Sequence, residues 1–215
     1  MSSLKLLHSG GNGVIISAPS SNPAADRTLT VPSNADGTIL TTTSPRSGAI
    51  IQAQTTQYTT AAGINCAQDT FVNLSDLNVS ITPVFASSKI LLSAFMTGEG
   101  NKNDLSWCFK MMRSVAGGSD QDVLKGTATG NRIPCMGSFP TGHFNGDNDS
   151  TPTTVSFANL LDSPSYSVGE AIVYKMFIHC ISSSAVWSVN GTNGGTDTQD
   201  YERSASYMTV MEVAA

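Results

Sequence analysis

The sequence is divided into short runs rich in Val, Ile, Phe and Thr, and no stretch keeps a helical apolar spacing for three turns. Gly, Pro, Asn and Asp separate these runs, which is typical of β-strands joined by turns. In the larger part of the chain we predict strands at residues 49–59, 77–82, 89–96, 106–112, 122–128, 152–160, 171–180, 185–189 and 204–213. Many strands without a long helix predict an all-β sandwich or barrel.

Residues 1–43 have a different character, with β-prone pieces at 13–17, 27–31 and 38–42 and few bulky side chains. The stretch NPAADRTLTVPSNADGTILTTTSP, residues 22–45, resembles two strands around a turn. Its large apolar side chains are only Leu29, Val31, Ile39 and Leu40, which is too little for an isolated hairpin. We therefore predict an arm that packs against copies of itself in a homotrimer, with these four side chains at the threefold axis.

The composition excludes several classes of partner. Charged residues make up 13% of the 215, the net charge is -5 and the pI is near 5.0. A nucleic-acid-binding surface needs clustered Lys and Arg, and the 11 present are dispersed. The longest apolar run, 171–181, contains Lys175 and His179, so neither a signal peptide nor a membrane span is predicted. We expect a protein that is assembled in a cytoplasm and does not insert into membranes.

The residues that could carry chemistry form no recognisable site. Four cysteines lie far apart without a CxxC pair, which predicts buried free thiols: Cys66, Cys108, Cys135 and Cys180. The three histidines share no ligand spacing, and the acidic loop 146–150 lacks the later Glu of a calcium loop. No pair of carboxylates or nucleophile elbow can be named. We predict no metal, no cofactor and no enzymatic activity.

The last predicted strand is apolar on both faces. Tyr207, Thr209, Met211 and Val213 alternate with Ser206, Met208, Val210 and Glu212. Only one face of a strand in a two-sheet sandwich meets the core, so the other would be covered by another chain. A strand covered on both faces within one chain is the alternative. The trimer-interface candidates in this strand are Tyr207, Met208, Val210 and Met211.

Several stretches together resemble the knob domain of short fibre proteins of tailed bacteriophages, especially those of marine cyanobacteria. They are FVNLSDLNVSITP from Phe71, SSKIL from Ser87, FKMMR from Phe109, LDSP from Leu161 with Tyr174 and Lys175, SVN from Ser188, and SYMTVMEV from Ser206. The arm is similar to fibre-shaft elements at residues 22–32 and 36–40. The resemblance implies a trimer with a short intertwined β shaft and a jelly-roll head similar to tumour-necrosis-factor heads, although almost no shaft is present here.

The resemblance divides the chain into a virion-attachment arm at residues 1–48 and a knob at 49–215. It implies a virion structural protein, attached to capsid or tail proteins by the arm, whose knob either binds a host-surface glycan or shields the shell. Side chains suited to glycan binding are Trp107, Phe144, Asn145, Asp147 and Trp187, with core packing as the alternative for the tryptophans. A free trimeric lectin or adhesin and a polysaccharide depolymerase are the other interpretations.

Overall fold

The computed structural model describes residues 3–17, 20–21, 45–101, 106–140, 152–180, 183–192 and 202–215. Contacts divide the chain into two units, Met1–Leu40 and Thr41–Ala215. The described part contains no helix of the length and apolarity that a membrane crossing requires.

In the first unit, β1 (Ser3–Leu7) and β2 (Gly13–Ser17) form an antiparallel hairpin in which Leu4 faces Ile16 and Leu6 faces Val14. The turn is closed by hydrogen bonds from the His8 N–H to the Asn12 carbonyl and from the Gly11 N–H to the His8 carbonyl. Gly11 has φ +95°, a conformation that L side chains rarely adopt, which explains a glycine here. Residues 13–17 were predicted as a strand and residues 3–7 were not.

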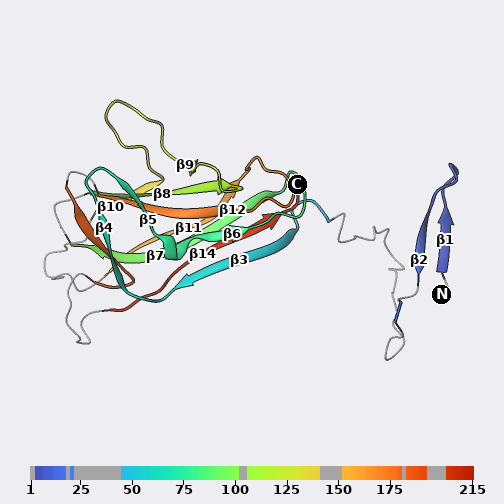
Figure 1. The fold of residues 1–215 in the computed structure, drawn as a ribbon, viewed down its shortest axis with the longest axis horizontal. Coiled ribbons are helices and arrows are strands. Elements are labelled where there is room, and N and C mark those ends of the chain that lie inside the picture. The colour runs from blue at the N-terminus through green and yellow to red at the C-terminus, as the bar shows by residue number, and fades with distance from the viewer. Residues whose placement is uncertain are drawn as a thin grey trace, which may run out of the picture. The chain divides into compact units, whose positions relative to one another are not determined.

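The second unit is a sandwich of two antiparallel sheets, which Figure 1 shows as layers with β8 and β12 in one and β3, β7 and β14 in the other. The first sheet contains β3 (Ile50–Tyr58), β14 (Ser206–Val213), β7 (Lys89–Gly100), β11 (Thr153–Asp162), β13 (Ala185–Val189) and β4 (Ala62–Cys66). The second contains β5 (Phe71–Asn73), β6 (Val79–Ile81), β12 (Ile172–Cys180), β8 (Ser106–Val115), β9 (Gln121–Leu124) and β10 (Gly137–Pro140). The all-β sandwich predicted from the sequence is confirmed.

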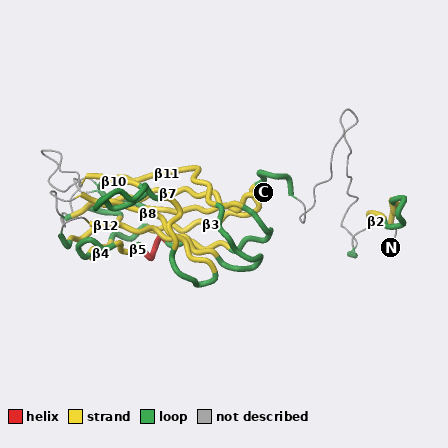
Figure 2. The backbone as a smooth tube through the Cα atoms, turned by 90° about the horizontal axis from the view of Figure 1, so that it is seen from above, coloured by secondary structure: helices red, strands yellow, loops and turns green. Residues whose placement is uncertain are grey.

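Two of the strand positions in the second sheet are interrupted. β5 and β6 pair with successive parts of β12, and the 3-10 turn Ser75–Leu77 separates them. Figure 2 shows this turn as the red segment beside β5. In the same way, β9 and β10 pair with successive parts of β8, and the chain between them loops out. Each pair therefore acts as one strand of the sheet.

Counted this way, the pairing is nested, because β3 pairs with β14, β4 with β13, β5 and β6 with β12, β7 with β11, and β8 with β9 and β10. The first strand thus meets the last, the second meets the second-last, and so on inward. Cross-pairs β14–β7 and β12–β8 then complete the two sheets. This is the connectivity of a jelly roll, in which a long antiparallel ribbon is rolled into two layers.

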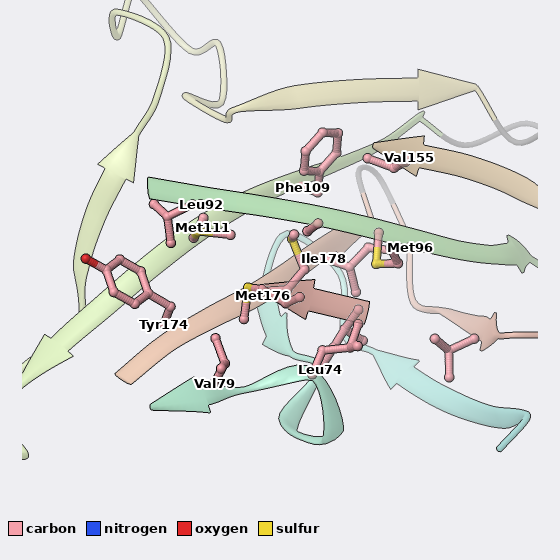
Figure 3. Close-up of a cluster of buried hydrophobic side chains, with 14 of the residues drawn as sticks. Leu74, Val79, Leu92, Met96, Phe109, Met111, Val155, Tyr174, Met176 and Ile178 are labelled. Carbon is pink, nitrogen blue, oxygen red and sulfur yellow. The ribbon is translucent and has the colours of Figure 1, made fainter. Parts of the chain in front are cut away.

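The hydrophobic core lies between the sheets and is drawn in Figure 3. Ile90, Leu92 and Met96 reach it from β7, and Met111, Tyr174 and Ile178 reach it from the facing sheet. These inward positions alternate along each strand, as the two-residue period of β structure requires. The same alternation leaves a second set of side chains on the outer side of each sheet.

The chain enters and leaves the sandwich at the same end. The Gly48 N–H donates to the Ala214 carbonyl at 2.9 Å, and the Ala214 N–H donates to the Ala49 carbonyl at 2.9 Å. The first residue of β7, Lys89, pairs with Val213 here, and Gly100 ends β7 at the opposite end. We call these the Gly48–Ala214 end and the Gly100 end.

Candidate assembly surface

The outer face of the β3–β14–β7–β11 sheet carries an apolar row that crosses four strands. Pairing places Ala53 beside Met211, Met211 beside Leu91, and Leu91 beside Leu161. Leu161 is 48% exposed, and Leu91 and Met211 are partly buried. Successive strands in a sheet lie about 4.8 Å apart, so this row is a continuous apolar strip.

An aromatic pair lies on the same face, four residues along β14 from Met211. Tyr207 pairs with Phe95 in register, and their rings stack with centroids 5.8 Å apart and an interplanar angle of 11°. Tyr207 remains 42% exposed. Between this pair and the apolar row, Thr55 and Thr209 share a hydrogen bond of 2.9 Å between their hydroxyl oxygens. The apolar outer face is therefore defined by Ala53, Leu91, Phe95, Leu161, Tyr207, Thr209 and Met211.

Two of the predicted trimer-interface residues lie on this face and two do not. Tyr207 and Met211 point outward, whereas Met208 is 1% exposed and Val210 is fully buried in the core of the same chain. The prediction for Met208 and Val210 is corrected, because their side chains pack against the second sheet and cannot reach a partner. The arm candidates Leu29, Val31, Ile39 and Leu40 lie outside the described residues.

The tryptophans proposed for glycan binding are core residues. Trp107 is fully buried and Trp187 is 1% exposed, and their rings pack at 5.2 Å between centroids, tilted by 56°. Glycines of β7 make room for them, since a Cβ at Gly98 would lie 2.5 Å from the Trp187 Nε1. Neither indole presents a face to a ligand. Phe144, Asn145 and Asp147 lie outside the described residues.

A buried carboxylate lies on the inner side of the same sheet at the Gly48–Ala214 end. Glu212, fully buried on the inner side of β14, accepts hydrogen bonds from Gln52 Nε2 and Ser88 Oγ, both at 2.8 Å. It also accepts the backbone N–H groups of Val84 and Phe85 at 3.1 Å. Burial alone would raise the pKa of Glu212, but these hydrogen bonds outweigh it and hold the pKa below its ordinary value. Glu212 thereby fixes the loop that carries the chain between the two sheets.

A second buried carboxylate ties the sheets together. Asp162, at the end of β11, accepts Arg113 Nη1 at 3.0 Å on both oxygens, and Arg113 belongs to β8 of the other sheet. Tyr174 Oη donates to the same carboxylate at 2.9 Å from β12. Burial raises the pKa of Tyr174, and the Asp162 charge raises it further, so the phenol stays protonated and donates. Asp162 thus makes a structural contact between the two sheets.

Two of the open hollows in the described part of the sandwich unit lie at opposite ends of it. One, of about 350 Å³, is lined by Ser87, Ser88, Lys89, Ser163, Pro164, Ser165 and Tyr166. The other, of about 400 Å³, is lined by Asn65, Cys66, Ala67, Asn101, Ser184, Ala185 and Val186. Neither is lined by an acidic side chain, so neither holds the pair of carboxylates that glycoside hydrolysis uses.

The thiols and the described histidine of β12 have structural surroundings. Cys66, Cys108 and Cys180 are buried free thiols as predicted, whereas Cys135 is only partly buried. Burial raises the pKa of Cys66 and of Cys108 to about 12, which keeps both protonated and unreactive. His179 packs on Phe71 with ring centroids 4.6 Å apart, and burial lowers its pKa. Within the described residues, no three of the His, Cys, Asp and Glu side chains gather as a metal site would need.

Comparison with known proteins gives distant structural similarities only. No protein-family model and no curated protein matches the sequence. Among solved structures, the chain is similar to one in the structure of infectious bursal disease virus Gx strain, with 11% identity, a TM-score of 0.33 and coverage of 94% of this chain and 47% of that one. For the Gt strain of the same virus the values are 12%, 0.28, 95% and 52%. The chain thus spans about half the length of these viral chains, and such low TM-scores do not define a shared fold.

Proposed function

We propose that the protein is a virion structural protein of a tailed bacteriophage: a short trimeric fibre or decoration knob that its N-terminal arm attaches to the particle. The apolar outer face of the β3–β14–β7–β11 sheet is the observation that carries this proposal. Soluble monomers rarely expose continuous apolar patches, and such patches mark interaction sites. A second copy of the chain is the partner that is present wherever the protein is made.

The sequence resemblance supports the same function by a second route. The stretches that resemble phage fibre knobs include SYMTVMEV, which is β14, and FKMMR, which is part of β8. In the proposed trimer, each copy contributes its apolar outer face near the threefold axis, and closed symmetry leaves no unpaired copy of the interface. The packing of residues 22–45 against copies of themselves remains a prediction of this proposal.

Two outward substitutions test the trimer. Leu161 and Tyr207 are already 48% and 42% exposed in one chain, so Leu161→Asp with Tyr207→Asp should leave the fold of a single chain intact. The matched control is Leu124→Asp, because Leu124 is 48% exposed on β9 of the other sheet. Light scattering should give three times the 22.4 kDa chain mass for the wild type and the control, and the chain mass for the double variant. A folded wild-type monomer at micromolar concentration, or a trimer that tolerates the double variant, would refute the interface.

The location of the protein tests its role. Antibody labelling of purified particles, viewed by electron microscopy, should mark either the capsid, as expected for decoration, or the tail, as expected for host recognition. Absence from purified particles would remove the virion role and favour the free trimeric lectin or adhesin. Glycan binding by the knob is part of the proposal only for the tail location, where a receptor is contacted.

We propose that the protein is not an enzyme, against the alternative of a polysaccharide depolymerase. The two described hollows of about 350 and 400 Å³ have no acidic lining residue, and the buried carboxylates Glu212 and Asp162 are engaged in structural hydrogen bonds. Incubation with host polysaccharide should release no new reducing ends. Sustained release would overturn this part of the proposal and leave the trimer unaffected.

A further inference from the structure

The β1–β2 hairpin exposes more apolar surface than a two-stranded ribbon can carry alone. On one face, Leu4, Leu6, Val14 and Ile16 are 58%, 55%, 65% and 48% exposed. Register places Leu4 opposite Ile16 and Leu6 opposite Val14, so these four side chains form a compact two-by-two block. An isolated hairpin is marginally stable in water at best, and this one has no covered face. Another surface must therefore complete it.

The two faces of the hairpin are not equivalent. Strand alternation puts Lys5 on the opposite face, where it pairs in register with Ile15 and where Leu7 and Ile15 are 68% and 56% exposed; Lys5 is what distinguishes this face. The block of Leu4, Leu6, Val14 and Ile16 contains no polar side chain, and Lys5 is the only charged side chain between Ser3 and Ser17. Two copies of the block can meet without charge repulsion. A docking site on a different protein would gain no charge complementarity from it.

The small size of the block indicates that its partner is the same block on another copy of the chain. A stable interface between separate proteins buries about 800 Å² per partner, contributed by some 20 to 30 residues. Four side chains fall well short of this, so the block cannot hold a free partner by itself. Copies that are already joined elsewhere meet at an effective concentration of about millimolar, at which a small contact forms. The proposed trimer of sandwich units would supply that joining.

We propose that the β1–β2 hairpins of one assembly pack on each other through the block of Leu4, Leu6, Val14 and Ile16. This inference rests on the proposed trimer and adds a second, separate contact among the copies, at residues 3–17. The hairpins then form a small closed bundle whose interior is apolar and whose outside carries Lys5.

Cross-linking of the full-length chain tests the bundle. In a Cys135→Ser background, which removes the one partly exposed native thiol, Leu6→Cys places a thiol in the block. Lys5→Cys is the matched control, since it is the adjacent residue on the opposite face. With a short bismaleimide, Leu6→Cys should form covalently joined chains at least about five times faster than Lys5→Cys, because only the first thiols face each other at the effective concentration of a tethered pair. Val14→Cys, directly opposite Leu6 in register, repeats the test if Leu6→Cys disturbs the hairpin.

The outcomes separate this inference from the proposed function. If the chain is trimeric by light scattering but neither Leu6→Cys nor Val14→Cys cross-links faster than the control, the bundle is refuted and the trimer stands. If cross-links appear only to a different protein in purified particles, the block is a docking element and the bundle is likewise refuted. A monomeric wild-type chain refutes both.

Discussion

Replacing Glu212 by glutamine should destabilise the sandwich although the side chain keeps its size. The carboxylate sits among four donors: Gln52 Nε2, Ser88 Oγ and the N–H groups of Val84 and Phe85. An amide has only one acceptor oxygen, so its NH₂ group must face at least one of these donors. The least costly orientation puts the NH₂ of the new glutamine toward Gln52. The Gln52 amide cannot rotate to accept from it without losing the hydrogen bond that its Nε2 donates to the Thr82 carbonyl at 2.7 Å.

The magnitude follows from what Glu212→Gln removes. One hydrogen bond to a charged group, worth about 1.5–3 kcal/mol, is lost, and the bonds that remain become neutral and weaker. The variant buries a neutral amide, so the unfavourable desolvation free energy of the charged carboxylate is absent, and this offsets some of the loss. We expect the free energy of unfolding to fall by about 2–3 kcal/mol near neutral pH. Glu202→Gln, at an exposed site, is the control and should change it by no more than about 0.5 kcal/mol.

The pH dependence gives the prediction its sharpest test. Since folding lowers the pKa of Glu212, its contribution is fully present above the ordinary value of 4.5 and is lost as pH falls through the folded pKa. Urea unfolding at a fixed protein concentration, followed by fluorescence of the buried Trp107 and Trp187, measures it at about pH 7 and about pH 3.5. The difference in the free energy of unfolding between wild type and Glu212→Gln (the gap) should be smaller at the lower pH. A gap below about 0.5 kcal/mol at pH 7, or one that does not narrow, would refute the assigned role of the carboxylate.

Two further predictions concern packing and redox state. Gly100→Ala should lower the free energy of unfolding by about 1–3 kcal/mol, because the added Cβ would lie 2.6 Å from Trp107 Cζ2. Gly126→Ala is the control and should be near neutral, because its Cβ would lie 3.7 Å from the nearest atom. Equal unfolding curves for the two variants would contradict this packing. Reducing agent should leave the thermal midpoint unchanged, because all four cysteines are free thiols; a drop equivalent to about 2–5 kcal/mol would reveal a missed disulfide.

The sequence predicts strands well where β-branched residues end at clear turns. Residues 13–17 and 185–189 match β2 and β13, and the last strand is two residues shorter than predicted. It fails where glycine lies inside a strand: the prediction stops at residue 96, but β7 continues to Gly100 because Gly98 and Gly100 face the indole rings. It also misses β5, with three residues, and β10, an edge strand that ends in proline.

The candidate surface shows a different limit. Alternation correctly separates the two faces of β14, but it cannot say which face turns inward when both are apolar. The inner face is the one that carries Glu212, the single charged residue of the strand. That choice depends on donors from Gln52 and Ser88, which are distant in sequence and which the fold alone brings together. The burial of Trp107 and Trp187 is likewise decided by the pairing of β7 with β13.

The position of the Gly48–Ala214 end also determines how the sandwich responds to mechanical load. β3 begins beside this end and runs antiparallel to β14, and hydrogen bonds between antiparallel strands lie perpendicular to both. A force that holds residue 49 and pulls at the Gly100 end acts along β3, so it strains the whole ladder in shear at once. A force between residue 49 and Ala214 opens the same ladder from its end, one bond after another. The domain is therefore mechanically anisotropic, and it is strongest when it is stretched along its strands.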